Sequence, residues 1–421
     1  MPFRPPEPRW DIVEEHLDEA EFLWGMWEHG LGSARHTLDT LALGPERRLL
    51  AHIDGLLVNG PEVAPRLLVP ALAAPAPDRV SAAAAALLAD PEPAGAAAVF
   101  DAWYAWPAQR PALARALAWA ERPDLLPLLR AQLADPEQWL ATAELLRLRG
   151  EPLGPALAQL LASDDPAARA LALRAAPDEP DPTIHIPTLI SCLAEPAPEP
   201  ELLDAAITAG VRLGLAPAWA RAQGRAQERH GGAALLLLAL RGATADHAIL
   251  LAAAARPKRR AAALWALGFL GLPEVVDTCI EFLDDPKVGH LAGEVFTAVT
   301  GVDLLAAGLA APRMDRVALV YTAEDELPRA DPVAVLQWWI RHRGRFRDGQ
   351  RYLAGAPYSR TAVRDALERG PMRRRPVHLL DLQLHAPAQP HAQPHRVRLA
   401  PRARTSRQRA QLAVLRGLPL A

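Results

Sequence analysis

Prolines recur at a nearly constant interval through the middle of this chain, and that interval restricts the possible folds more than any other feature. The spacings are 30, 29, 30 and 30 residues between Pro77, Pro107, Pro136, Pro166 and Pro196. The next expected position holds Ala226, after which Pro257 and Pro286 resume the pattern. Apolar segments with helical spacing flank these turns. Each interval of about 30 residues therefore predicts two short helices, close to a HEAT-type unit.

The stretch from Arg256 to Leu304 shows the sequence pattern of such units. It contains three short amphipathic segments, each opened by a proline or by a turn that contains one. Proline suits the first helical turn because its missing N–H has no partner there. The third segment places apolar residues on one helix face, at Val288, Leu291, Ala292, Val295, Phe296 and Val299. A single helix of this length cannot bury such a stripe, so we expect the helices to stack.

Composition agrees with many short helices. Half of the 421 residues are hydrophobic but only 5% are aromatic, and most of the apolar residues are alanine and leucine, which favour helices. The 42 prolines exclude long uninterrupted helices, and the sparse β-branched residues argue against a large sheet. Asp precedes the periodic proline at three turns, which is typical of a repeated turn, at Asp135, Asp165 and Asp285.

The sequence therefore predicts an all-α fold, an α-solenoid of about seven or eight HEAT-like two-helix repeats. Residues 1–65 are expected to form an N-terminal helical cap, because this segment does not match the repeat. Residues 66–304 form the array of units of about 30 residues. Residues 305–385 form a C-terminal helical extension, and residues 386–421 form a basic tail rich in Pro, His and Arg that is partly disordered.

Six sequence segments carry a resemblance to a known family. They are HLDEAEFLW from residue 16, RRLLAHIDGL at 47–56, WALGFLG at 265–271, AGEVFTAVTGVDL at 292–304, LPRADPVAVLQWW at 327–339 and GRFRDGQRYLAGAP at 344–357. Together they make the chain resemble an uncharacterised bacterial family of HEAT-repeat proteins, with repeats like those named in phycobilisome bilin lyases. The resemblance implies an α-solenoid. It also implies a context beside type VI secretion genes, near spike proteins and effector adaptors, and it supplies no catalytic residues.

Charge is unevenly distributed along the chain. The net charge is −3, but residues 341–421 contain 18 arginines and four acidic residues, a net charge of +14. The first 340 residues therefore carry −17. In the basic part, arginines alternate with aromatic residues, a pattern that suits phosphates and stacked bases. It also suits an acidic protein partner or the chain's own acidic N-terminal array, and we expect a protein partner rather than a nucleic acid. The candidate partner-binding residues are Trp338, Trp339, Arg345, Phe346, Arg373, Arg374 and Arg375.

No pattern in the sequence indicates catalysis, a cofactor or a metal. The GxSxG, Walker and GxGxxG motifs are absent. His16 and Glu19 share a helix face without a partner Glu-x-x-His helix, and His52 and Asp54 lie on different faces. The later histidines, which belong to a His- and Pro-containing segment, are His378, His385, His391 and His395. Cys192 and Cys279 lie in apolar helical patterns and are expected to be buried small hydrophobes.

The start of the chain lacks the order of a signal peptide, and no apolar run is long enough for a membrane span, so we expect a cytoplasmic protein. The leading hypothesis is a non-catalytic scaffold or adaptor that binds a protein partner, such as a type VI spike or effector protein. One alternative is a HEAT-like protein that binds nucleic acid through the basic C-terminus. Another is an enzyme resembling a bilin lyase, which would need a tetrapyrrole pocket.

Overall fold

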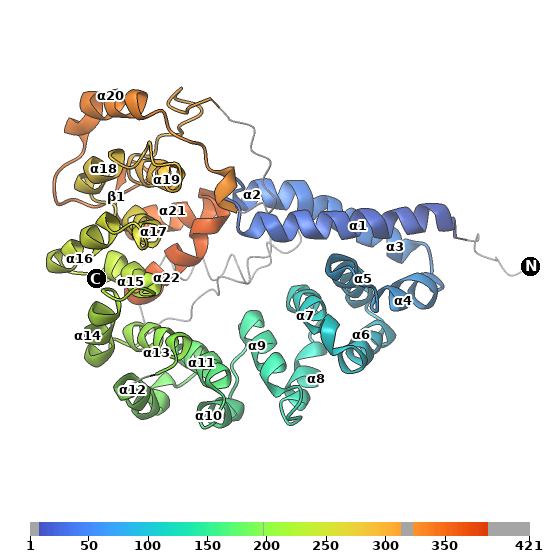
Figure 1. The fold of residues 1–421 in the computed structure, drawn as a ribbon. Helices are drawn as coiled ribbons and strands as arrows, with labels where there is room; N and C mark the ends of the chain where they lie inside the picture. Colours follow the sequence, from blue (N-terminus) through green and yellow to red (C-terminus); the bar gives the residue numbers. More distant parts are fainter. Residues whose placement is uncertain (1–7, 197, 313–322, 386–421) are drawn as a thin grey trace, which may run out of the picture. The chain divides into compact units, whose positions relative to one another are not determined.

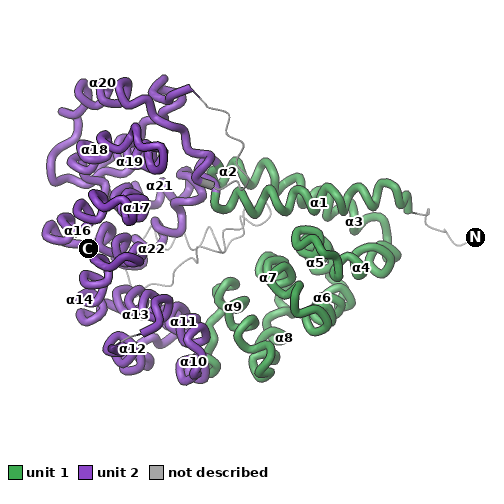
Figure 2. The backbone as a smooth tube through the Cα atoms, viewed as in Figure 1, with its two compact units in different colours: residues 1–32, 36–156, 392–409 green, residues 33–35, 157–391, 410–421 purple. Residues whose placement is uncertain are grey.

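The computed structural model describes residues 8–196, 198–312 and 323–385, and these residues are nearly all helical (Figure 1). The all-α prediction is therefore confirmed. The described chain divides into two compact units (Figure 2). Unit 1 holds residues 8–32 and 36–156, and unit 2 holds residues 33–35 and the described residues from 157 to 385. The division falls inside the segment 66–304 that the sequence assigns to one array, and the predicted tail 386–421 lies outside the described residues.

Unit 1 contains one long helix of 22 residues (Trp10–Leu31) and otherwise short helices and turns. The expectation that long helices are excluded is wrong for this segment, which has no proline. The helices of unit 1 are α1 (Trp10–Leu31), α2 (Leu38–Leu41), α3 (Arg47–Val58), α4 (Val69–Ala71), α5 (Pro77–Ala89), α6 (Pro93–Ala105), α7 (Arg110–Trp119), α8 (Leu125–Gln132) and α9 (Trp139–Arg149). Helix α1 packs on α3 and α5, α5 packs on α7, and α7 packs on α9. The core of this layer includes Leu17, Leu23 and Trp24, all without exposed surface. Burial of these apolar side chains holds the layer together.

Helix α10 (Pro155–Leu161) contains the division between the units, and the remaining helices belong to unit 2. They are α11 (Pro166–Ala175), α12 (Ile186–Ala194), α13 (Pro200–Arg212), α14 (Ala216–Arg225), α15 (Gly232–Arg241), α16 (Thr244–Ala255), α17 (Arg260–Leu270), α18 (Pro273–Ile280), α19 (Gly289–Thr300), α20 (Pro332–His342), α21 (Arg360–Arg369) and α22 (Arg375–His385). A two-stranded hairpin, β1 (Tyr352–Leu353) and β2 (Ala356–Pro357), interrupts the helices.

Alternate helices of unit 2 stack in order. Helix α11 packs on α13, α13 on α15, α15 on α17, and α17 on α19. The even-numbered helices α12, α14, α16 and α18 each pack against one or both of their odd-numbered neighbours (Figure 1). The odd-numbered helices from α11 to α19 thus form one packed layer, and the even-numbered helices lie against it. Helix α22 packs on α13, α15 and α21.

The Asp-Pro turns have a common geometry. The side-chain oxygen of Asp165 accepts a hydrogen bond from the backbone N–H of Ala167 at 2.9 Å, and Asp285 accepts one from Lys287 at 2.9 Å. The carboxylate satisfies an N–H two residues on, while proline removes the N–H that would have no partner. The hydrogen bond from Lys287, together with the Arg260 guanidinium, holds the pKa of Asp285 below its usual range.

The structure also explains the one missing proline in the series. Ala226 follows α14 and donates its backbone N–H to the carbonyl of Ala222 at 2.8 Å, a bond that proline cannot make. The carbonyl of Ala226 accepts a hydrogen bond from the Arg259 guanidinium, 33 residues later. In unit 1, Arg149 likewise donates to the carbonyl of Ala120. In each case an arginine binds the carbonyl groups at the end of a helix of an earlier pair.

Candidate partner-binding site

Helix α20 carries the two tryptophans that the sequence singles out. Asp331 begins the helix by accepting hydrogen bonds from the backbone N–H groups of Val333 and Ala334 at 2.9 and 3.0 Å. The two indoles then have different surroundings. Trp339 is buried, and its Nε1 lies 2.6 Å from a carboxylate oxygen of Asp277 in α18. Trp338 is half-buried and lines a pocket.

An aromatic row connects α20 to the hairpin. The ring of Phe346 lies 5.3 Å from that of Trp339 and 5.0 Å from that of Tyr352, centroid to centroid, and all three rings are buried. Trp338 stacks on His342 at 4.3 Å and meets Phe296 of α19 edge-on. These contacts fix the segment that follows α20 against the end of the stacked layer.

The hairpin is bound to the ends of α17 and α19. Tyr352 donates its backbone N–H to the carbonyl of Gly271 at 2.7 Å, and Gly355 donates to Val299 at 3.0 Å. Gly271 has a φ of +72°, and a Cβ there would lie 2.3 Å from the carbonyl oxygen of Tyr352. Glycine is required at this position both by the left-handed backbone and by the approach of the strand.

Arg351, just before the hairpin, binds three helix-terminal carbonyl groups. Its guanidinium donates to Leu270 at 3.0 Å and Phe269 at 3.1 Å, both at the end of α17, and to Leu240 at 3.3 Å at the end of α15. The same group lies 4.0 Å from the ring centroid of Tyr358. A cation at two helix C-termini interacts favourably with the partial negative charge there.

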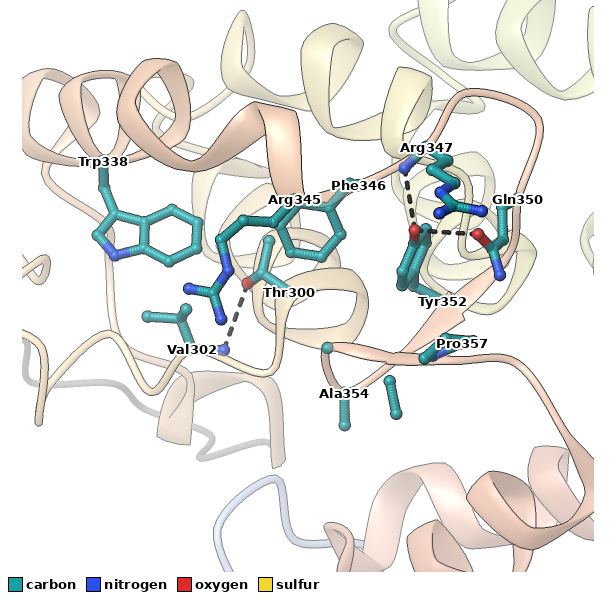
Figure 3. Close-up of a pocket in the computed structure, with 12 residues that line it drawn as sticks. Thr300, Val302, Trp338, Arg345, Phe346, Arg347, Gln350, Tyr352, Ala354 and Pro357 are labelled. Atoms are coloured by element: carbon teal, nitrogen blue, oxygen red, sulfur yellow. Dashed lines mark hydrogen bonds between the residues drawn. The ribbon is translucent and has the colours of Figure 1, made fainter.

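These elements enclose a pocket of about 770 Å³ within unit 2 (Figure 3). The volume is within the usual range for ligand pockets. Its lining residues are Thr300, Val302, Trp338, Arg345, Phe346, Arg347, Gln350, Tyr352 and the hairpin residues 354–357. The pocket therefore contains three of the predicted partner-binding residues, Trp338, Arg345 and Phe346.

The arginines around the pocket differ in whether they form ion pairs with other side chains. Arg343 lies outside the lining and forms ion pairs with Asp348 and Asp277. Arg345 and Arg347 are exposed, and neither guanidinium has an ion pair or a hydrogen bond among the residues that the structure describes. None of the twelve lining residues is acidic, so the pocket has a positive charge without a compensating group.

The structure places the predicted residues Arg373, Arg374 and Arg375 in the interior of unit 2. Arg373 pairs with Glu324 at 3.1 Å, and Arg374 is 5% exposed and lies 3.5 Å from Glu294. Burial lowers the pKa of Arg374 and lowers the pKa of Arg375 to about 10. Arg373 and Arg374 contact Trp265 of α17 and Glu294 of α19, and Arg375 is buried at the start of α22.

The candidate partner-binding residues left out Arg347, and sequence reasoning missed Gln350 and the hairpin. The sequence around Ala354 and Gly355 predicts an irregular, turn-rich link. In the structure these two residues have φ values of 50° and 82°. Two consecutive positive φ values belong to the tight turn of a two-residue hairpin. The only signal in the sequence is one glycine at the second turn position, flanked by Tyr352 and Leu353 on one side.

Two of the other candidate residues, His16 and His52, lie side by side in unit 1. His16 and His52 lie with their Nδ1 atoms 3.1 Å apart, and burial, followed by the charge of His16, lowers the pKa of His52. In residues 8–196, 198–312 and 323–385 no group of three or more His, Cys, Asp or Glu side chains is arranged to hold a metal ion. Cys192 and Cys279 are buried, as expected.

His378 and His385 of the predicted His-containing segment belong to α22, whereas His391 and His395 lie outside the described residues. Across the described part of the chain, no helix is long and apolar enough to cross a membrane. No protein-family model and no curated protein matches the sequence.

Proposed function

We propose that this protein is a non-catalytic scaffold or adaptor, built as an α-solenoid of HEAT-like repeats, that binds a protein partner. The observation that carries the proposal is the regular packing of alternate helices within each unit. In unit 2 this order runs from α11 to α19 without interruption. Solenoids of this kind expose extended surfaces, and those surfaces bind proteins.

Contacts between neighbouring helix pairs support the repeat. Side-chain hydrogen bonds recur between residues separated by about one repeat length, from Arg149 to Ala120 and from Arg259 to Gln227. These separations, 29 and 32 residues, are close to the length of the predicted two-helix unit. Each arginine lies against the carbonyl end of an earlier helix, α7 or α14, where a cation interacts favourably with the partial negative charge.

The surroundings of the aromatic residues favour a protein partner over a nucleic acid. A single-stranded nucleic acid is bound by exposed rings that stack on bases. In this chain Trp339, Phe346 and Tyr352 are buried, and one face of Trp338 is covered by His342. Arg374 and Arg375 are also buried in unit 2, and Arg373 is half-buried there. The basic segment therefore offers charge without a stacking platform.

The resemblance to a family found beside type VI secretion genes makes a spike or effector protein the proposed partner. The test is to recover the tagged full chain from its native organism and to identify bound proteins by mass spectrometry, with the tag alone as the control. We expect a spike or effector protein to be enriched. Enrichment of no protein over the control contradicts the scaffold function, and recovery of nucleic acid instead would favour the alternative.

A further inference from the structure

The pocket of unit 2 combines two cationic groups with hydrogen-bond donors. The hydroxyl of Tyr352 accepts a hydrogen bond from the backbone N–H of Arg347 at 2.9 Å and donates to Oε1 of Gln350 at 3.2 Å. This chain of hydrogen bonds fixes the amide of Gln350, so that its Nε2 is left to donate. With Arg345 and Arg347, the lining presents donors and positive charge and no carboxylate. Its chemistry selects an anionic ligand.

The positions of the two arginines indicate more than one anionic group on the ligand. Figure 3 shows Arg345 beside Trp338, Thr300 and Val302, whereas Arg347 lies beside Tyr352 on the other side of Phe346. The two guanidinium groups therefore lie at different ends of the pocket. An extended chain with several carboxylates can reach both groups, and each planar guanidinium can bind a carboxylate through two parallel hydrogen bonds.

Charge complementarity supports an acidic segment as the ligand. The first 340 residues carry −17 and repel an acidic chain, whereas residues 341–421 carry +14. An acidic segment approaching this protein is therefore directed to its C-terminal part. Within the described residues of that part, Arg345 and Arg347 line this pocket.

We propose that this pocket binds an acidic peptide segment of the protein partner, with Arg345 and Arg347 each holding a carboxylate group. The inference rests on the proposed scaffold function, because that function supplies the partner. It adds the chemistry of the recognised segment and the two residues that select it.

The probe is an oligoglutamate peptide that carries a photoreactive benzophenone group, added to the full chain at physiological salt. Crosslinks are mapped by mass spectrometry, because the position of a crosslink distinguishes binding in the pocket from binding to other basic segments. We expect crosslinks within residues 338–357, and we expect the double substitution R345Q/R347Q to reduce them at least tenfold. The matched control is R341Q/R369Q, which removes the same charge from exposed arginines outside the lining and should leave the yield within twofold.

Competition experiments identify the ligand class. Unlabelled oligoglutamate should abolish the crosslinks in 338–357, and oligoglutamine of the same length should not. The inference is overturned if crosslinks map only outside 338–357, or if R345Q/R347Q and R341Q/R369Q lose equal yield. It is also overturned if oligothymidylate competes better than oligoglutamate, because a nucleic acid is then the preferred ligand.

Recovery of the partner separates this inference from the scaffold function. If R345Q/R347Q recovers the partner as well as the native chain does, the pocket inference fails and the scaffold function stands. If the native chain recovers no partner while oligoglutamate still crosslinks to 338–357, the scaffold function fails and the specificity of the pocket for carboxylates stands. Circular dichroism and thermal unfolding should show both double variants folded like the native chain, since the four arginines are exposed.

Discussion

The indole N–H of Trp339 donates to the carboxylate of Asp277 at 2.6 Å, and this bond joins α20 to α18 across 62 residues of sequence. Asp277 also pairs with Arg343 at 3.5 Å. The carboxylate therefore contacts two side chains that lie between Trp338 and Arg345, which both line the pocket. Burial of the indole makes the bond important, because an unpaired buried donor is costly.

Trp339→Phe should reduce the free energy of unfolding by about 1–3 kcal/mol, because the hydrogen bond to Asp277 is lost. Urea unfolding of the full chain measures this change. The control is Ile340→Ser, at a neighbouring side chain that is 69% exposed, which should change stability by less than about 0.5 kcal/mol. Equal effects of the two substitutions would contradict a structural role for the Trp339 bond.

Gly271→Ala should destabilise unit 2 because its Cβ would collide with the carbonyl of Tyr352. The strain of the left-handed backbone costs about 1 kcal/mol, and the collision adds to it. Gly214 provides the matched control, since its φ is +73° and a Cβ there meets no atom within 4 Å. Thermal unfolding should show a clearly larger loss for Gly271→Ala than for Gly214→Ala, and equal losses would exclude close docking of the hairpin.

Arg351→Met should destabilise the hairpin and the ends of α15 and α17. Methionine keeps much of the aliphatic stem but leaves three helix-terminal carbonyl groups without their donor, which costs about 2–4 kcal/mol in total. Hydrogen exchange of the backbone amides of Tyr352 and Gly355 should accelerate in the variant. Arg341→Met is the control, because Arg341 is exposed and its hydrogen bond among the described residues is to Gln337 in its own helix. Unchanged exchange in Arg351→Met would refute the role of this side chain.

Stability should fall in acid through His378. Burial, with the nearby charges of Arg374 and Arg375, lowers the pKa of His378 to about 3. In the unfolded chain His378 is therefore protonated as the pH falls through about 6.5, whereas in the folded chain it stays neutral until about pH 3. This group is neutral in both states above pH 6.5, and stability is lost as the pH falls through that window, by at most about 1.4 kcal/mol per pH unit.

The check is the slope of unfolding free energy against pH in His378→Leu, which should be shallower than in the native chain between about pH 6.5 and 4. His385→Gln gives the opposite comparison. The Asp381 carboxylate raises the pKa of His385, so its stabilising contribution is present at low pH and lost as the pH rises through the raised pKa. An unchanged slope in His378→Leu would show that His378 is not held neutral by burial.

The fold class could be predicted because it is encoded locally. Short alanine- and leucine-rich segments and Asp-Pro turns act within a few residues, and the bond from Lys287 to Asp285 needs no other part of the chain. The hairpin could not be predicted, because its strands are held by Gly271 and Val299 rather than by their own propensity. A strand of two residues leaves no periodic pattern in a sequence.

The candidate site could be predicted only in part, for a related reason. Three consecutive arginines at 373–375 are typical of a solvated basic face. Their burial depends on Glu294 of α19 and on the rings of Trp265 and Phe269 of α17, which lie about 80 to 110 residues earlier in the chain. Arg345, which lacks such partners, remains exposed at the pocket. No local sequence pattern distinguishes an arginine that will be buried from one that will stay exposed.

The hairpin has a consequence for assembly. In unit 2 the layer from α11 to α19 has an outermost helix, and in principle a further helix pair from another molecule could stack there. Trp338 and the hairpin occupy that place. The backbone N–H groups of Ala354 and Gly355 donate to the carbonyl groups of Ala298 and Val299 at the end of α19. A further helix could therefore not pack on this end of α19 without displacing Trp338 and the hairpin.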